Sequence, residues 1–203
     1  MSRLLLIRHA QPEKDATIQA SEWRLSHRGR QSCELLAETL NAYGLTRLIS
    51  SVEPKAVETA QRTARFMGIP SEIALGLHEH DRSNVGFIPD GERFSKIVKQ
   101  LFDKRDEKVF GAETAHQALV RFSTAVDGLL KQHVDEGLGL VTHGTVMSLF
   151  VAAHNSVDGY SFWARLTLPC VVRLDLPSMR LTNENSLIAI SPPGHAKLDP
   201  MDD

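Results

Sequence analysis

Cysteine is scarce in this sequence. Only Cys33 and Cys170 occur among 203 residues, with no CxxC pair and no histidine at zinc-ligand spacing. Two isolated thiols provide neither a disulfide framework nor a structural zinc site, because such a site needs four ligands close together. We expect both cysteines to be buried and reduced, which predicts a cytoplasmic protein.

Long apolar runs and an excess of charge are absent as well. The apolar run at residues 4–7 is too short for the core of a signal peptide, and no stretch approaches the ~18 to 20 apolar residues of a membrane helix. Lysine and arginine number 23 against 25 aspartates and glutamates, which gives a net charge of -2. The overall charge therefore predicts binding to neither nucleic acid nor anionic membranes, and recognition of an anion would need a local group of cations.

The chain does contain an alternation of short apolar runs and helical patterns. This alternation predicts a three-layer α/β sandwich, with a mostly parallel central sheet flanked by helices. We expect a single domain over residues 1–191, a lid-like insertion at about 78–113, and a flexible tail at 192–203. The expected strands are 3–7, 47–50, 73–77 and 138–142, with a further pair at 166–176 and 185–190. The expected helices are 27–41, 54–67, 92–104, 114–133 and 144–154.

Two of the expected strands end in a histidine. His9 closes the run LLLIRH, and His143 closes GLVTH about 130 residues later. The carboxyl ends of parallel strands lie on one edge of a sheet, where α/β proteins bind ligands. A histidine at a strand end is most often structural, but two in the same topological position favour a functional site. We therefore expect the two imidazoles to meet at this edge.

Arg8, directly before His9, favours an anionic ligand over a metal ion. Zinc needs three or four ligands, and a fixed cation beside it costs electrostatic energy, whereas a guanidinium matches the geometry of phosphate. A neutral imidazole can attack phosphorus if cations and backbone amides hold the oxygens and a carboxyl group protonates the leaving alkoxide. Gly144 and Thr145, at the start of the helix after His143, can supply such amides. The residues thus indicate phosphoryl transfer.

Several stretches resemble, in the right order, the motifs of the histidine phosphatase superfamily, also called phosphoglycerate mutase-like. The resemblance extends over about residues 3–190 and implies the α/β sandwich and the phosphohistidine chemistry of that family. The stretches are LLLIRHAQP (4–12), LSHRGRQ (25–31), SVEPKAVETA (51–60), LHEHDR (77–82) and VTHGTV (141–146), and GAET (111–114) followed by Arg121 fits a further motif.

The resemblance implies a role for each matching residue. His9 would be the nucleophile that becomes phosphohistidine, and Arg8 would bind the phosphoryl oxygens. His143 would donate a hydrogen bond to a nonbridging oxygen. Glu79 would be the general acid and later the base that activates water, because it follows the apolar strand end by two residues as the family's acid does. Its rivals are Asp81 and Glu13.

Lys55 is the main departure from the family pattern, which usually has arginine there. We expect Lys55 to contact the phosphate as a point charge without the planar fork of a guanidinium. Alternatively, Arg62 substitutes for it, although seven residues along a helix is ~10 Å of rise, or the site is weakened. Ala10 in place of glycine and Gln11 in place of glutamate affect only the shape of the phosphate loop.

These features predict a metal-independent phosphomonoester hydrolase without a cofactor, acting on a small phosphorylated metabolite or a phosphoprotein. A phosphoglycerate-type mutase is the first alternative, but it must exclude water, and only 11–25 and 78–113 are available as cover. The second is a protein that binds a phosphorylated ligand without turnover, and a third is a metal-dependent hydrolase. The physiological substrate and the oligomeric state stay open.

The cations after Glu79 are candidates for substrate specificity. His80 and Arg82 are the first of these, and His78, Lys14 and Arg24 could join them in binding a second anionic group. This interpretation favours small acidic phosphoesters, while sugar phosphates and phosphoproteins are also compatible with it. Exposed charges of no functional importance are the competing interpretation.

Overall fold

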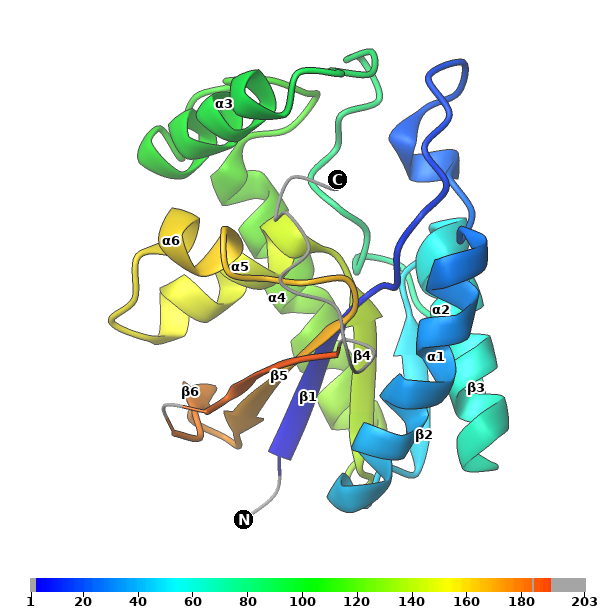
Figure 1. The fold of residues 1–203 in the computed structure, drawn as a ribbon. Coiled ribbons are helices and arrows are strands. Elements are labelled where there is room, and N and C mark those ends of the chain that lie inside the picture. Colours follow the sequence, from blue (N-terminus) through cyan, green and yellow to red (C-terminus); the bar gives the residue numbers. More distant parts are fainter. Residues whose placement is uncertain (1–2, 184, 191–203) are drawn as a thin grey trace.

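A mixed seven-stranded sheet forms the centre of the protein in the described residues (Figure 1). The computed structural model describes residues 3–183 and 185–190. The strand order is β3-β2-β4-β1-β5-β6, and β7 also pairs with β5. The strands are β1 (Arg3–Arg8), β2 (Arg47–Ser50), β3 (Ser71–Ile73), β4 (Leu138–Thr142), β5 (Cys170–Asp175), β6 (Arg180–Leu181) and β7 (Leu187–Ala189).

Helices cover both faces of this sheet. They are α1 (His27–Leu40), α2 (Pro54–Met67), α3 (Gly91–Asp103), α4 (Ala115–Gln132), α5 (Gly144–His154) and α6 (Gly159–Trp163), with the short 3-10 helices η1 (Ala20–Glu22) and η2 (Asn41–Tyr43). The strands β3, β2, β4 and β1 are parallel, and β5 runs antiparallel to β1. The predicted α/β sandwich with a mostly parallel sheet is therefore confirmed.

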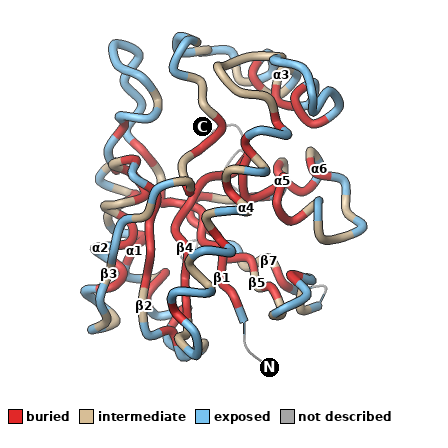
Figure 2. Tube along the Cα trace, turned by 180° about the vertical axis from the view of Figure 1, so that it is seen from behind, coloured by how far each residue is buried: buried red, intermediate tan, exposed pale blue. Residues whose placement is uncertain are grey.

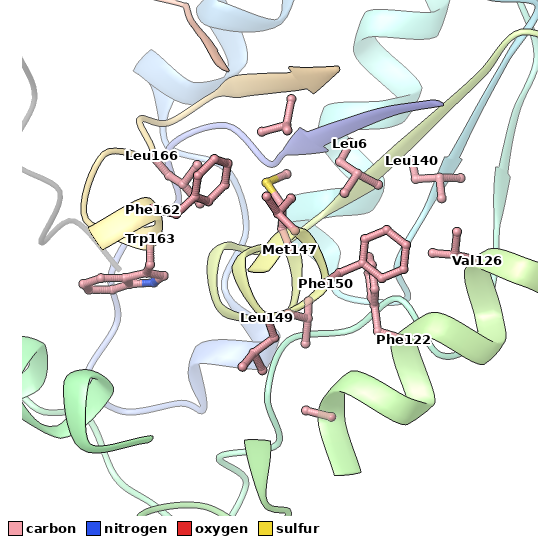
Figure 3. Close-up of a cluster of buried hydrophobic side chains, with 14 of the residues drawn as sticks. Leu6, Phe122, Val126, Leu140, Met147, Leu149, Phe150, Phe162, Trp163 and Leu166 are labelled. Carbon is pink, nitrogen blue, oxygen red and sulfur yellow. The ribbon is translucent and has the colours of Figure 1, made fainter. Parts of the chain in front are cut away.

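Alternating residues of β1 separate the core into two layers. Leu4 and Leu6 belong to one apolar cluster, in which α3, α4, α5 and α6 take part, whereas Leu5 and Ile7 pack with α1 and α2 on the other face. This alternation follows from the two-residue period of a strand. Figure 3 shows the first cluster, where Leu6 and Leu140 of the sheet face Met147 and Phe150 of α5. Figure 2 shows the buried strands in the middle of the trace.

Local sequence signals place several helix ends. Ser26 caps α1 by accepting a hydrogen bond from the Gly29 amide, as its position in the sequence predicts. Pro54 stands in the first turn of α2, and Gly68 ends that helix with a left-handed backbone (φ 68°). Thr114 and Gln117 form a capping box at the start of α4.

The third strand is not where the apolar pattern predicts it. The strand covers Ser71–Ile73, and residues 74–77 lie outside it. Gly76 has φ 87°, which interrupts an extended strand, and Leu75 is 82 % exposed, so the run IALGL is not a buried strand. The strand expected at 166–176 begins only at Cys170, and β6 and α6 were not predicted.

Two segments rise beyond the carboxyl ends of the parallel strands (Figure 1). One is the irregular stretch 11–25 with η1, and the other is 78–113, which contains a loop and α3. Both are the stretches that the sequence offers as cover for a site. The tail expected at 192–203 lies outside the described residues. Within those residues, none of the helices combines the length and hydropathy needed to cross a membrane.

Candidate active site

Strand pairing brings the two predicted histidines together. Arg8 of β1 lies opposite Thr142 of β4, and the His9 amide donates to the Thr142 carbonyl at 3.0 Å. The residues that follow, His9 and His143, therefore emerge side by side from adjacent parallel strands. Their ring centroids are 5.1 Å apart, and both side chains are almost fully buried. The pairing of the imidazoles at the strand ends is thus as the sequence predicts.

The backbone fixes the tautomer of His9. Its Nδ1 lies 2.8 Å from the carbonyl oxygen of Ala10. Because a carbonyl oxygen only accepts, Nδ1 is the donor in the neutral ring and Nε2 carries the lone pair. Thr59 of α2 accepts a hydrogen bond from the Ala10 amide at 3.0 Å, which holds the loop after β1. The arrangement gives His9 the form that a nucleophile needs.

A small cavity adjoins the two histidines, and we call it the phosphoryl subsite. The residues that line it come from five separate parts of the chain, so no short motif encodes it. They include one lysine, one arginine and one glutamate, a composition suited to an anion and a proton donor. The lining residues are His9, Pro12, Ala20, Trp23, Lys55, Glu79, Arg82 and His143.

Glu79 is the carboxylate that reaches this subsite. Its two oxygens accept hydrogen bonds from the amides of Thr145 (3.0 Å) and Val146 (3.1 Å) in the first turn of α5, and from that of His80 (2.8 Å). A carboxylate is favoured at a helix N-terminus by these donors and by the helix dipole. Oε1 accepts two of these bonds and Oε2 accepts one, so a lone pair remains on Oε2, through which the fixed carboxyl group can still exchange a proton with a ligand.

The two rivals of Glu79 lie elsewhere. Asp81 does not line the phosphoryl subsite, and its carboxylate accepts a hydrogen bond from the Ser83 amide at 2.9 Å. Hydrogen bonds from Ser83 lower the pKa of Asp81, which opposes the role of a proton donor. Glu13 is exposed and also lies outside the lining. The positions of the three carboxylates and the lowered pKa of Asp81 therefore favour Glu79 as the proton donor.

Lys55 lies in the subsite with two hydrogen bonds. Its Nζ is 2.8 Å from a carboxylate oxygen of Glu53 and 2.6 Å from the carbonyl oxygen of Ala20. An ammonium group has three donors, so one remains for a phosphoryl oxygen. The contact of Lys55 with phosphate as a point charge stays a prediction. Arg62 does not line the subsite.

Glu53 is a residue that the sequence reasoning missed. Its buried carboxylate contacts Lys55, accepts a hydrogen bond from the Glu79 amide at 2.8 Å, and lies 3.4 Å from Nε2 of His143. The hydroxyl oxygen of Ser51 lies 2.7 Å from the same Nε2 of His143. Glu53 thus links the lysine, the second histidine and the segment that carries Glu79. The only signal in the sequence is that a carboxylate follows a buried strand by three residues.

Three expected phosphate ligands, Arg8, Gly144 and Thr145, are not among the residues that line the subsite. Arg8 is buried outside the lining of the subsite, where its Nη1 donates to the Leu166 carbonyl at 2.9 Å. Its Nε is 3.2 Å from the point that a Cβ on Gly144 would occupy, so it packs beneath the start of α5. The Thr145 amide donates its hydrogen bond to Glu79, so a phosphoryl oxygen could bind this amide only by displacing that carboxylate.

Arg121 and Glu113 hold the segment around Glu79 in place. Arg121 of α4 donates to the carbonyl oxygens of Gly76 (2.8 Å), His78 (2.9 Å) and Glu79 (3.1 Å). Glu113 pairs with Arg121 and accepts from the Asp81 amide at 2.9 Å. The GAET stretch and its arginine therefore position the predicted acid without contacting the subsite.

His80 is part of this support, and Arg82 is not. The His80 ring is buried, and its Nε2 donates to the Glu113 carbonyl at 2.8 Å, so it is not available to a substrate anion. Burial lowers the pKa of both His78 and His80, which keeps them neutral near pH 7. Arg82 lines the subsite. Lys14 and Arg24 do not, and Arg24 lies 3.5 Å from Glu58 instead.

No group of three or more His, Cys, Asp or Glu side chains in the described residues is arranged to hold a metal ion. What the arrangement offers is a ring nitrogen with a lone pair, a second imidazole, cations and a fixed carboxyl group. These groups can bind a phosphoryl group and move one proton.

Comparisons with known proteins agree with the fold and indicate the family. The family model described as histidine phosphatase superfamily (branch 1) matches residues 4–182. No curated protein matches the sequence. Among solved structures, a mycobacterial glucosyl-3-phosphoglycerate phosphatase in complex with VO3 is 19% identical, with a TM-score of 0.70, over 89% of this chain and 96% of that chain.

Two other solved structures have the same fold. A mutant phosphoserine phosphatase from Entamoeba histolytica in complex with phosphoserine is 17% identical, with a TM-score of 0.71, over 90% of this chain and 96% of that one. YhfR from Bacillus stearothermophilus is 20% identical, with a TM-score of 0.70, over 91% of this chain and 96% of that chain. At these identities the likeness concerns the fold.

Proposed function

The chain belongs to branch 1 of the histidine phosphatase superfamily, and from this membership we propose that it hydrolyses phosphomonoesters through a phosphohistidine on His9. The observation that carries the proposal is the phosphoryl subsite, in which His9, His143, Lys55 and Glu79 face one small cavity. The tautomer of His9 adds to this support, because Nδ1 is held by the Ala10 carbonyl and Nε2 has the lone pair.

In the first step, Nε2 of His9 attacks phosphorus and the bond from phosphorus to the ester oxygen breaks. Lys55, Arg82 and His143 hold the phosphoryl oxygens, whose charge they offset in a site screened from water. A proton on Glu79 passes to the leaving oxygen, so the product departs as an alcohol. The electron pair of the broken bond stays on that oxygen.

In the second step, water attacks the phosphohistidine. Glu79, now ionised, takes a proton from the water, the bond from phosphorus to Nε2 breaks, and inorganic phosphate leaves. His9 returns to its starting form, and the cycle consumes one water for each ester. No step of this sequence needs a metal ion, and full activity in EDTA is the expected result. Restoration of lost activity by zinc would support the metal-dependent alternative.

A cytoplasmic location is part of the proposal. Cys33 and Cys170 are both buried, and burial raises the pKa of Cys33 to about 11. A buried thiol with a high pKa is unreactive, because the thiolate is the reacting form. These two cysteines therefore suit a reducing compartment.

The test is release of phosphate by the purified wild type and by His9→Ala. We expect the wild type to release inorganic phosphate from a phosphomonoester without any added bisphosphate, and His9→Ala to lose at least about 1,000-fold in kcat. His116→Ala is the matched control, because His116 is exposed on α4 and does not line the subsite. Acid quenching followed by mass spectrometry should find the phosphoryl group on His9.

Each alternative has its own outcome in this experiment. Isomerised product without phosphate release would favour a mutase. Binding of the phosphomonoester without turnover by the wild type would favour a non-catalytic binding protein. A phosphoryl group trapped on another side chain, or full activity of His9→Ala, would contradict the proposed mechanism.

A further inference from the structure

A larger cavity of about 370 Å³ opens beside the phosphoryl subsite. This volume lies within the range of sites that bind small molecules. Ala20, Trp23, Glu79 and Arg82 line both cavities, so the two adjoin each other. A phosphomonoester whose phosphoryl group lies against His9 would therefore extend its alcohol part into the larger cavity.

Aromatic rings form much of the wall of this cavity. Trp23, Phe87, Phe94 and Phe110 all line it, together with aliphatic residues of the 78–113 segment. Trp23 and Phe87 meet edge to face, with centroids 5.7 Å apart, and Phe94 and Phe110 do the same at 6.2 Å. The guanidinium of Arg82 lies 5.2 Å from the Phe94 centroid and 5.9 Å from that of Phe110. Such walls favour a flat apolar group.

Exposed apolar side chains gather at the mouth of the cavity. Val52 is 43% exposed, Leu75 82% and Phe87 37%, and all three line it. They are three of the eight exposed large apolar side chains among the described residues. Apolar side chains left in contact with water around a cavity indicate a binding surface, because covering them releases that water.

The charges of the cavity oppose a second anion. Of the groups that line it, Glu53, Glu79 and Asp81 are carboxyl groups, and Arg82 is the permanent cation. The pKa values of His78 and His80 are lowered by burial, so neither ring adds a positive charge near pH 7. A carboxylate or second phosphate on the substrate would thus meet more negative than positive groups. The small acidic phosphoesters favoured by the sequence fit this wall poorly.

We propose that this cavity binds the alcohol part of the substrate, and that this part is an aromatic ring or an apolar group of similar size. The inference rests on the proposed function for the position of the phosphoryl group. It adds a substrate class, aryl-bearing or otherwise bulky apolar phosphomonoesters, and it assigns Phe87 and Trp23 to selectivity.

Three synthetic esters test the proposal: 3-phenylpropyl phosphate, propyl phosphate and 3-carboxypropyl phosphate. All three are esters of primary alcohols of similar basicity, so the leaving group is matched and only the distal group differs. We measure kcat/KM with the wild type, and dissociation constants with His9→Ala by calorimetry. Burying a phenyl ring should raise kcat/KM and tighten binding about tenfold or more relative to the propyl ester. The carboxypropyl ester should do no better than the propyl ester.

Variants of two phenylalanines link the effect to the cavity. Phe87→Ala should remove most of the advantage of the phenylpropyl ester, a loss of about fivefold to tenfold, and affect the propyl ester much less. Phe87→Leu, which keeps an apolar side chain, should restore part of it. Phe66→Ala is the matched control, because Phe66 is 54% exposed on α2 and does not line the cavity.

The two readouts separate this proposal from the proposed function. Equal hydrolysis and equal binding of the phenylpropyl and propyl esters would overturn the aromatic cavity and leave the phosphatase intact. Selective binding of the phenylpropyl ester without phosphate release would support the cavity and contradict the phosphatase. Preference for the carboxypropyl ester would overturn the cavity and favour acidic substrates.

Discussion

At the scale of single residues, we expect the charge of Glu53 to influence how strongly the proposed phosphoryl subsite binds phosphate. Its carboxylate lies 2.8 Å from Nζ of Lys55 and 3.4 Å from Nε2 of His143. In a buried setting, a carboxylate so close offsets much of the positive charge that a phosphoryl group would otherwise meet. Glu53 therefore stabilises the empty site and weakens anion binding.

The variant Glu53→Gln should be less stable than the wild type and should bind inorganic phosphate more tightly. The glutamine side chain keeps an oxygen that can accept the hydrogen bond from the Glu79 amide, but it loses the ion pair with Lys55. Because Lys55 borders a cavity, removing its partner should lower the free energy of unfolding by ~3 kcal/mol or less. We expect a lower melting temperature together with roughly fivefold tighter binding of inorganic phosphate, equivalent to about 1 kcal/mol. Thermal melts with and without phosphate measure both effects.

The control for this variant is Glu72→Gln, which alters an exposed glutamate on β3 away from the subsite. Its phosphate affinity should equal that of the wild type. Weaker phosphate binding by Glu53→Gln would mean that the carboxylate positions Lys55 more than it offsets its charge.

Sequence reasoning predicted the residues that stand at strand ends and missed those whose role depends on packing. His9 and His143 follow from strand position, and Glu79 follows from the resemblance to the family. Nothing local in the sequence tells that Glu53 points inward to Lys55, or that Arg8 turns to the Leu166 carbonyl. Those directions depend on contacts between segments far apart in the chain.

At the scale of elements, Gly111 allows the two ends of the 78–113 segment to touch. Its φ is 96°, and a Cβ there would lie 2.2 Å from the carbonyl oxygen of Asp81 and 2.7 Å from the His80 ring. A side chain would therefore be strained by the backbone angle and would push the segment that carries Glu79.

Gly111→Ala should cost ~2 kcal/mol or more in stability and lower kcat, through the combined backbone strain and clash. Gly128→Ala is the opposite case, because Gly128 lies inside α4 and a Cβ there meets nothing within 4 Å. This control should raise stability by about 0.5–1 kcal/mol without changing kcat. Chemical denaturation and steady-state kinetics of the two variants provide the comparison. Equal stability of Gly111→Ala and the wild type would contradict the close approach.

Arg121 makes a second contact between elements, because its hydrogen bonds join α4 to the segment that leads to Glu79. Arg121→Ala removes hydrogen bonds from a charged group to three carbonyls, and such bonds contribute roughly 1.5–3 kcal/mol each at most. We expect a loss of ~3 kcal/mol in unfolding free energy and a lower kcat, with partial rescue by Arg121→Lys. A lower KM with unchanged kcat would argue against a positioning role.

The elements themselves were largely predictable, and the failures have physical causes. Ser26, Pro54 and Gly68 mark helix ends through caps and fixed backbone angles, which are local properties. The third strand was misplaced because its apolar residues are exposed at an edge, where burial no longer selects the pattern. The helix α6 has only five residues, too few for a helical period to appear in the sequence.

At the scale of the whole molecule, the half-buried His78 and the buried His80 should make stability depend on pH. The pKa values of His78 and His80 are lowered from 6.5, chiefly by burial. Below pH 6.5 the unfolded chain binds protons that the folded protein does not, so the free energy of unfolding falls as the pH falls. Above pH 6.5 both states are neutral at these rings, and their contribution is fully present.

We therefore expect the melting temperature to decline between pH 7 and pH 5 by more in the wild type than in His80→Gln. The glutamine amide can keep the hydrogen bond to the Glu113 carbonyl, but it does not titrate. Protonation of the His80 ring would instead bury a second donor at Nδ1, which has no hydrogen-bond partner in the described residues. Circular dichroism melts over this pH range test the difference. Parallel curves for the two proteins would exclude His80 as a source of the pH dependence.

The pairing of β1 with β4 and β5 also has a consequence for the newly synthesised protein. The strands on either side of β1 are synthesised more than 130 residues after His9. Contacts of such long range form late, and the candidate site cannot assemble before β4 and β5 have been made. Under the proposed function, a nascent chain should therefore release no phosphate until β4 and β5 have left the ribosome, which would protect the cell from premature hydrolysis.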